Sequence, residues 1–183
     1  YPNEVANGNG FLVGGNGNMM NQWGAAAQYK AAFSGVAVEG TARYAAADYT
    51  DSGVGPREDA SAYGIGAKVG FMGFEVAGSY QDLGDSGVLK ANKSTQDAGQ
   101  WWDIGVAYGT GPYKVSVMYM RSEATDSAAG DDTVDYFQVG AGYAAAPGLD
   151  FYAAYQYVDL DNAGSTTTDN EANLFLVGTQ VSF

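Results

Sequence analysis

Apolar and polar residues alternate with a period of two along most of the chain. In residues 113–121, Tyr113, Val115, Val117 and Tyr119 fall on one face of an extended strand, and Lys114 begins the opposite, more polar face. This period is typical of β-strands that keep one face away from water. The pattern predicts nine strands, at residues 22–32, 36–49, 62–71, 74–82, 100–110, 113–121, 133–145, 149–159 and 171–183.

Two kinds of connection join the predicted strands. Long polar loops at residues 50–61, 83–99, 122–132 and 160–170 alternate with tight turns that contain Gly or Pro. The turns recur about every 38 residues, at Ser34-Gly35, Met72-Gly73, Gly111-Pro112 and Pro147-Gly148. A β-propeller has a similar period, but each of its blades needs four short strands where this chain has two long ones.

The apolar face carries aromatic residues near both ends of most predicted strands, with smaller aliphatic residues between them. Two aromatic belts around an aliphatic band are the order that a lipid bilayer selects. We predict that the belts include Trp23, Tyr63, Phe71, Trp102, Tyr108, Tyr113, Tyr119, Phe137, Tyr143 and Phe183. A soluble lipocalin-like barrel or a sandwich would also alternate, with the apolar face inside. Neither explains aromatic residues at both ends of the strands.

Charge and composition exclude several classes of function. The chain has 8 basic and 21 acidic residues and a formal net charge of −13, which argues against binding to nucleic-acid phosphates. It contains no His and no Cys, so a Ser-His-Asp triad is excluded and a catalytic zinc site is disfavoured. No run approaches the ~20 apolar residues of a membrane helix. We therefore expect neither an enzyme nor a resident cofactor.

Long alternating strands, Gly- and Pro-containing turns and acidic loops occur here together with a C-terminal VGTQVSF. In these features the chain resembles the Gram-negative general porins, and the hairpins YGIGAKVGFMGFEVAGSYQD and FQVGAGYAAAPGLDFYAAYQY are similar to those of alphaproteobacterial members. The resemblance implies an all-β fold, a transmembrane antiparallel β-barrel in the outer membrane. It also implies a water-filled channel for passive diffusion of ions and small hydrophilic solutes. The implied partners are outer-membrane lipid and lipopolysaccharide, two further copies in a homotrimer, and the assembly machinery that reads Phe183.

The chain is shorter than the porins it resembles, and nine is an odd number of strands, whereas bacterial barrels have even numbers. We therefore expect the C-terminal half of a barrel of 16 strands, as the resemblance implies. Residues 1–21 would be an extracellular loop or the end of a preceding strand, and residues 22–183 the strands of a single barrel domain. A tenth strand over residues 4–14 could instead complete a small barrel, but this segment is rich in Gly and Asn.

The polar face of the strands is predicted to line the channel. Alternation assigns to it charged residues of both signs, which tune ion selectivity in pores: Lys30, Glu39, Arg43, Lys68, Glu75, Asp103, Lys114 and Asp150. The resemblance places Arg43, Lys68 and Lys30 opposite a constriction loop that lies outside this sequence. A small structural or adhesive barrel with a plugged lumen is the alternative. Inward-facing glycines such as Gly64, Gly66 and Gly178 favour an open, watery lumen.

Most carboxylates fall in or beside the long loops. They could bind Ca²⁺ that bridges to lipopolysaccharide phosphates, because hard cations prefer carboxylate oxygens; solvated loops are the simpler interpretation. Asp159 and Asp161 begin a DLDNAG segment similar to the start of a calcium loop, but the expected glutamate comes one position late, at Glu171. They are the weak candidates for a metal site.

Overall fold

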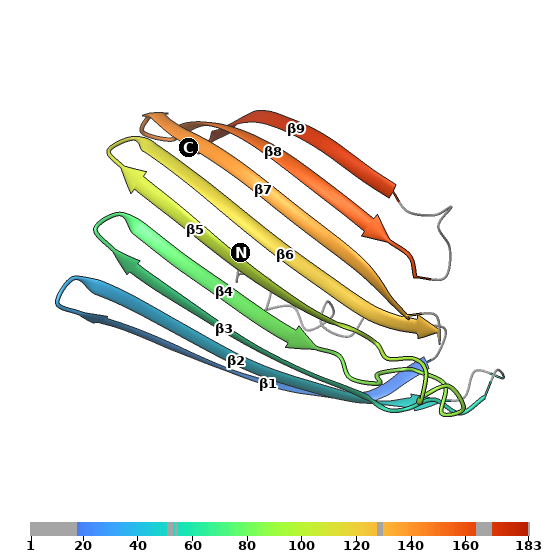
Figure 1. The fold of residues 1–183 in the computed structure, drawn as a ribbon. Coiled ribbons are helices and arrows are strands. Elements are labelled where there is room, and N and C mark those ends of the chain that lie inside the picture. Colours follow the sequence, from blue (N-terminus) through green and yellow to red (C-terminus); the bar gives the residue numbers. More distant parts are fainter. Residues whose placement is uncertain (1–17, 51–52, 54, 128–129, 164–169, 183) are drawn as a thin grey trace.

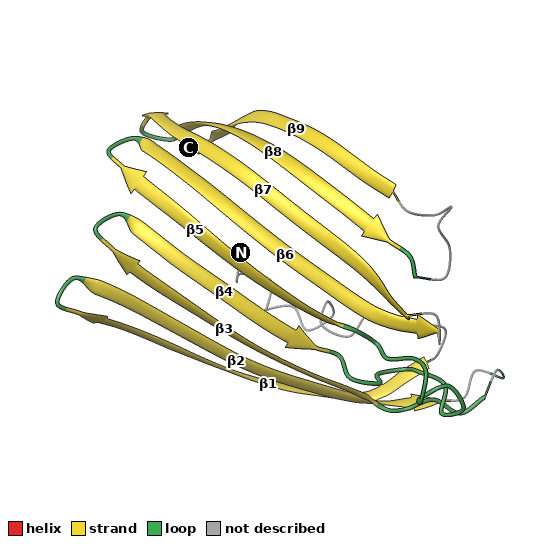
Figure 2. Cartoon of the chain, viewed as in Figure 1, coloured by secondary structure: helices red, strands yellow, loops and turns green. Residues whose placement is uncertain are grey.

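The computed structural model describes residues 18–50, 53, 55–127, 130–163 and 170–182. These residues form a single sheet of nine antiparallel strands in sequence order, and Figure 2 shows strands joined by loops and turns. Among the described residues, no helix is long and apolar enough to span a bilayer. The strands, labelled in Figure 1, are β1 (Asn18–Phe33), β2 (Val36–Thr50), β3 (Ala60–Phe71), β4 (Phe74–Asp82), β5 (Gln100–Thr110), β6 (Tyr113–Ser127), β7 (Gly130–Ala146), β8 (Leu149–Asp161) and β9 (Asn170–Val181).

The nine predicted strands are confirmed, and β4 and β5 have the predicted bounds. Six strands are longer than predicted, and the longest extensions are those of β1 and β6. β1 begins at Asn18, four residues before the predicted start, because a bulge between Met20 and Trp23, with Asn21 at a φ of 51°, breaks the alternation there. β6 continues past Arg121 to Ser127 and pairs there with the start of β7. Both segments are mostly polar, so they show no alternation of apolar and polar residues. Residues 1–17, including the alternative tenth strand, lie outside the described residues.

Two of the tight turns take the backbone conformation that hairpins prefer. Ser34 and Gly35 have φ values of 50° and 82°, and Met72 and Gly73 have 50° and 85°. Two successive residues with positive φ match the right-handed twist of the flanking strands. The two glycines differ in surroundings: nothing lies within 4 Å of a Cβ built at Gly35, whereas one built at Gly73 would collide with the carbonyl oxygen of Gly109.

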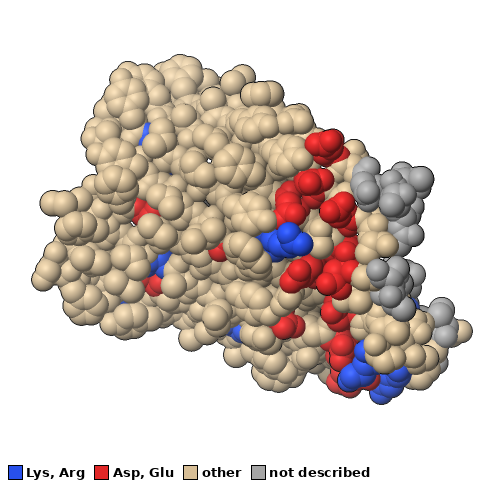
Figure 3. All heavy atoms as spheres, viewed as in Figure 1, with Lys and Arg blue, Asp and Glu red and all other residues tan. Residues whose placement is uncertain are grey.

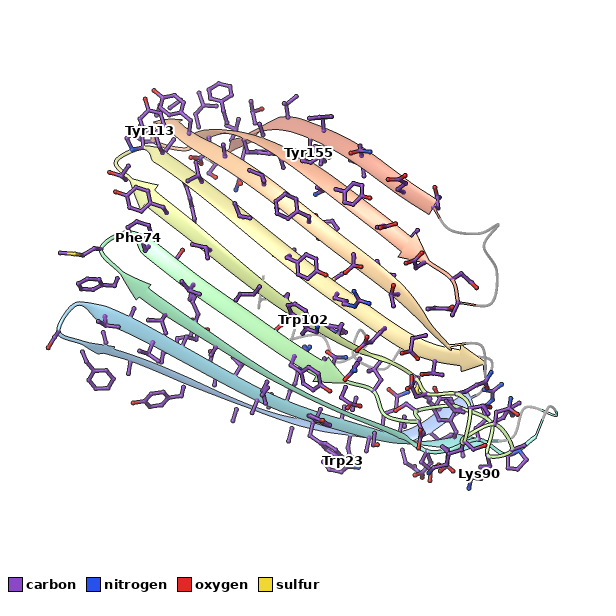
Figure 4. The ribbon with its side chains drawn as sticks, in the orientation of Figure 1. Trp23, Phe74, Lys90, Trp102, Tyr113 and Tyr155 are labelled. Atoms are coloured by element: carbon purple, nitrogen blue, oxygen red, sulfur yellow. The ribbon has the colours of Figure 1, made fainter. Side chains whose placement is uncertain are left out.

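The sheet has almost no core among the described residues. The buried apolar side chains there are Ala47, Ala60, Ala62 and Val88, and no large side chain is fully buried. Large apolar residues are exposed instead, and most of them lie on one face, which we call the aromatic face. In Figure 4 the labelled Trp23 lies below β1 and β2, and the labelled Tyr113 lies at the upper left, beside the turn between β5 and β6. Because the rings do not pack into a dry centre, the alternative of a soluble sandwich or lipocalin-like barrel is contradicted.

On the aromatic face, aromatic rings lie near both ends of the strands. Ring pairs flank the tight turns, as in Phe74–Tyr108 and Tyr113–Tyr143, and others lie toward the long loops, as in Trp102–Tyr119. Between them a continuous row of valines crosses five strands in register: Val69, Val76, Val106, Val117 and Val139. All predicted belt residues lie on this face except Phe183, which is outside the described residues. A broad exposed apolar band of this kind is a membrane-facing surface.

Candidate channel lining

The opposite, polar face gathers every charged residue that the alternation assigned to the channel. The register pairs Lys30 with Glu39 and Glu39 with Lys68, and it continues this face through Glu75 and Lys114. Arg43, Asp103 and Asp150 belong to the same face by the alternation within β2, β5 and β8. On the seven strands that carry them, the eight residues share one face; that this face lines a channel stays a prediction.

Five of these residues form one chain of ion pairs, which we call the charge ladder: Lys30, Glu39, Lys68, Glu75 and Lys114. The Nζ of Lys30 lies 3.2 Å from Oε1 of Glu39, whose other oxygen lies 3.6 Å from Nζ of Lys68. Glu75 then lies 3.8 Å from Lys68 and 3.2 Å from Lys114. With three lysines and two glutamates, the ladder has a formal charge of +1.

Small residues on β5 allow the ladder to cross that strand. Lys114 is on β6 and Glu75 on β4, and the β5 residues facing them in register are Gly109 and Ala107. A larger β5 side chain would stand between the ammonium and the carboxylate. Glu39 is the best shielded member, with its side chain 14% exposed, whereas the Lys30 and Lys114 side chains are 62% and 60% exposed. The two terminal lysines are therefore the most exposed members of the ladder.

Nearer the long loops, Arg43 donates to the side-chain oxygen of Gln81, and Ser79 donates to Asp103. The Arg43 side chain lies across Gly64, so closely that a Cβ at Gly64 would be 2.7 Å from its Nε. Glycine on β3 thus makes room for the guanidinium rather than for water alone. Gln81 and Ser79 were not among the predicted site residues, because the selection considered charged side chains.

The polar face of β7 and β8 carries a neutral hydrogen-bond network. Its residues were not among the predicted lining residues, which were all charged. Tyr136 donates from its hydroxyl to Oε1 of Gln138 at 2.6 Å, and Nε2 of Gln156 donates to the same oxygen at 2.9 Å. Closer to the tight turns, Tyr152 faces the same side between Gly142 and Gly178. The inward positions of the alternation were the signal that could have identified these residues.

The loop between β4 and β5 folds against the loop between β2 and β3 (Figure 1). The backbone of Glu58 pairs with Gly87 and Val88, and Ser86 Oγ bonds the backbone of Ser61. Lys93 lies 3.1 Å from Asp85 and 3.4 Å from Glu58. Hydrogen bonds to these two carboxylates, Asp85 first, raise the pKa of Lys93. These contacts hold the β4–β5 loop against the β2–β3 loop.

Carboxylates gather on the aromatic face above the belt nearest the long loops, where Figure 3 shows a red band across the strand ends. We call it the acidic collar; it comprises Asp82, Glu123, Asp135, Asp159 and Glu171. Belt tyrosines donate to it, from Tyr119 to Asp135 and from Tyr157 to Glu171 (3.0 Å). Arg121 lies 3.3 Å from Asp135. Within the described part of the chain, no group of three or more carboxylates is arranged to hold a metal ion, around Asp159 and Asp161 included.

Comparison with known proteins agrees with this geometry. A family model described as Gram-negative porin matches residues 1–163. A monosaccharide porin of a Halomonas species and a major outer membrane protein of Halomonas elongata are each 31% identical over 126 residues, which cover 67% of this chain and 33% of the relative. An uncharacterized protein of Rickettsia felis is 30% identical over 129 residues, 67% of this chain and 28% of that protein. The chain thus aligns with about a third of the length of these curated relatives. It belongs to the Gram-negative porin family and is an outer-membrane protein.

Proposed function

We propose that the protein forms a water-filled channel through which ions and small hydrophilic solutes diffuse passively. The observation that carries this proposal is the charge ladder. Its ion pairs lie on one face of a sheet whose other face exposes a row of valines. A row of ionised side chains needs water, and a row of exposed valines needs lipid. A wall with these two faces separates an aqueous lumen from a bilayer.

The solutes would include neutral sugars. One relative bears the name monosaccharide porin, and the sheet described here offers both charged and neutral polar surface to the lumen. The family likeness also supports assembly as a homotrimer and recognition of Phe183 by the outer-membrane assembly machinery.

Planar-bilayer recording of the purified full-length protein tests the channel. Stepwise increases in conductance are expected, and a protein that inserts without conducting would refute the proposal.

Ion selectivity tests the ladder itself. The double variant Glu39→Gln/Glu75→Gln keeps side-chain size but changes the formal ladder charge from +1 to +3. In a KCl gradient the zero-current potential should shift toward chloride preference, because fixed positive charge attracts anions. The matched control is Glu171→Gln, which removes a carboxylate from the aromatic face. Equal potentials in both variants would remove the ladder from the selectivity-determining residues.

A further inference from the structure

On the polar face, the strands β7 to β9 carry different side chains from those of β1 to β6. All basic residues of the chain precede residue 122, so β7, β8 and β9 contain no Lys or Arg. The described polar-face carboxylates on these strands are Asp132, near the long loops, and Asp150, near the tight turns. Between them lie amides, tyrosine rings, glycines, alanines and aliphatic side chains. These three strands therefore form a neutral track beside the charge ladder.

Tyr152 presents an aromatic ring on this track. In register it stands between Gly142 of β7 and Gly178 of β9, so neither neighbouring residue has a side chain. The hydroxyl end of the ring lies directly over Gly178, where an added Cβ would overlap it. The ring consequently lies along the wall instead of standing into the lumen. It remains 49% exposed, and the exposed part forms a flat apolar platform.

The hydrogen-bonding part of the track lies four residues further along β8, about 13 Å away at the rise of a β-strand. Tyr136 and Gln156 both donate to the side-chain oxygen of Gln138. Among the described residues, no other group bonds the amide N–H₂ of Gln138 or the side-chain oxygen of Gln156. The pair thus offers a donor and an acceptor side by side. Between the pair and Tyr152 lie Gly140 and Ala154, which project little from the wall.

We infer that this track, formed by Tyr136, Gln138, Gln156 and Tyr152, is a binding site for neutral polyhydroxylated solutes of monosaccharide size. The inference rests on the proposed channel function and deepens it. A sugar hydroxyl both donates and accepts, which matches the amide pair, and the C–H face of a sugar ring matches the tyrosine platform. At the amide pair, which faces Met118 and Leu174 in register, an ionic solute would lose part of its hydration without meeting an opposite charge. The two contacts are too far apart for one monosaccharide to make both, so the solute moves from one to the other.

Glucose is the probe, added to the full-length protein in a planar bilayer while ion current is recorded. A saturable reduction of the current by glucose is expected. Tyr152→Ala should weaken it about 3- to 10-fold, the effect of a typical aromatic contact. Tyr152→Phe should retain it, because the ring remains, and Gln138→Leu should weaken it. Tyr29→Ala, on the aromatic face, is the control and should leave it unchanged. Stepwise conductance in each variant shows that the barrel has formed.

The outcomes separate the two proposals. A protein without conductance would refute the channel and, with it, the site. A conducting channel without saturable glucose block, or with the same block in Tyr152→Ala, would overturn the site alone. Glucuronate, a similar ring with a carboxylate, tests the preference for neutral solutes. Block as strong as that by glucose would contradict that preference.

Discussion

The assignment of one face to lipid and the other to water can be tested with two neighbouring residues of β6. Val117 lies in the valine row between Val106 and Val139, and its side chain is 46% exposed. Met118 follows it in sequence and points to the polar face, in register with Gly105 and Gln138. Arginine at either position has the same charge, the same size and nearly the same depth. The variants Val117→Arg and Met118→Arg therefore differ in the face that receives the charge.

The position of Val117 sets the magnitude. Tyr113 and Tyr119 belong to the two belts, and Val117 is one residue, about 3 Å, from the midpoint between them. An arginine on the lipid face near the bilayer midplane costs about 2–4 kcal/mol, which lowers the folding equilibrium constant about 30- to 1000-fold. Met118→Arg places its guanidinium beside water and a polar neighbour, so its cost should stay within about 1 kcal/mol.

Reversible unfolding in guanidinium from lipid vesicles, followed by tryptophan fluorescence, measures both free energies. We expect a much lower midpoint for Val117→Arg and a midpoint close to that of the unmodified protein for Met118→Arg. If Met118→Arg loses as much stability as Val117→Arg, or more, the two faces have been assigned wrongly. Unchanged midpoints in both variants would show that neither face meets lipid.

Three further predictions concern local contacts. Gly35→Ala should destabilise the protein by the ~1–2 kcal/mol that a positive φ costs an alanine, because a Cβ there meets open space. Gly73→Ala should cost more, because its Cβ would also collide with the carbonyl oxygen of Gly109. The unfolding midpoints of the two variants test this difference. Lys93→Met should make the β4–β5 loop more sensitive to limited proteolysis, whereas Lys90→Met should not, since Lys93 has the ion pairs of that loop. Because the pKa of Lys93 is raised above 10.5, the unmodified loop should keep its protection below that pH and lose it above the raised value. Tyr119→Phe removes a hydrogen bond to the acidic collar and should cost about 1 kcal/mol in the same unfolding assay.

The sequence predicted strands well wherever one face was continuously apolar. The bounds of β4 and β5 were predicted correctly because their outward positions are aromatic or aliphatic along most of each strand. The prediction missed residues 18–21 of β1, where a bulge shifts the alternation. It also missed the ends of β6 and β7, where Glu123 pairs with Thr133 and Thr125 with Asp131. Backbone pairing stabilises those segments, and their side chains do not form part of a continuous apolar face. Their sequence therefore lacks the alternation from which the strands were predicted.

The charged candidates were predictable from alternation, but their partners were not. Lys68 contacts Glu39 and Glu75 because the register of three strands brings them together, and register depends on the turns as well as on the pattern. The neutral residues Gln138 and Tyr152 were missed for another reason. Charge was the criterion, although any side chain at an inward position can meet a solute.

The inward glycines show how far composition can mislead about a lumen. They were expected to leave room for water. Gly64 instead lies under the side chain of Arg43, and Gly178 lies under the ring of Tyr152. In each case a glycine on one strand lets a long side chain of the neighbouring strand lie along the wall. At these two positions the polar face is shaped by a pair, a glycine with the large residue that covers it. The number of inward-facing glycines therefore indicates the free space on the polar face only when the register shows which side chain lies over each glycine.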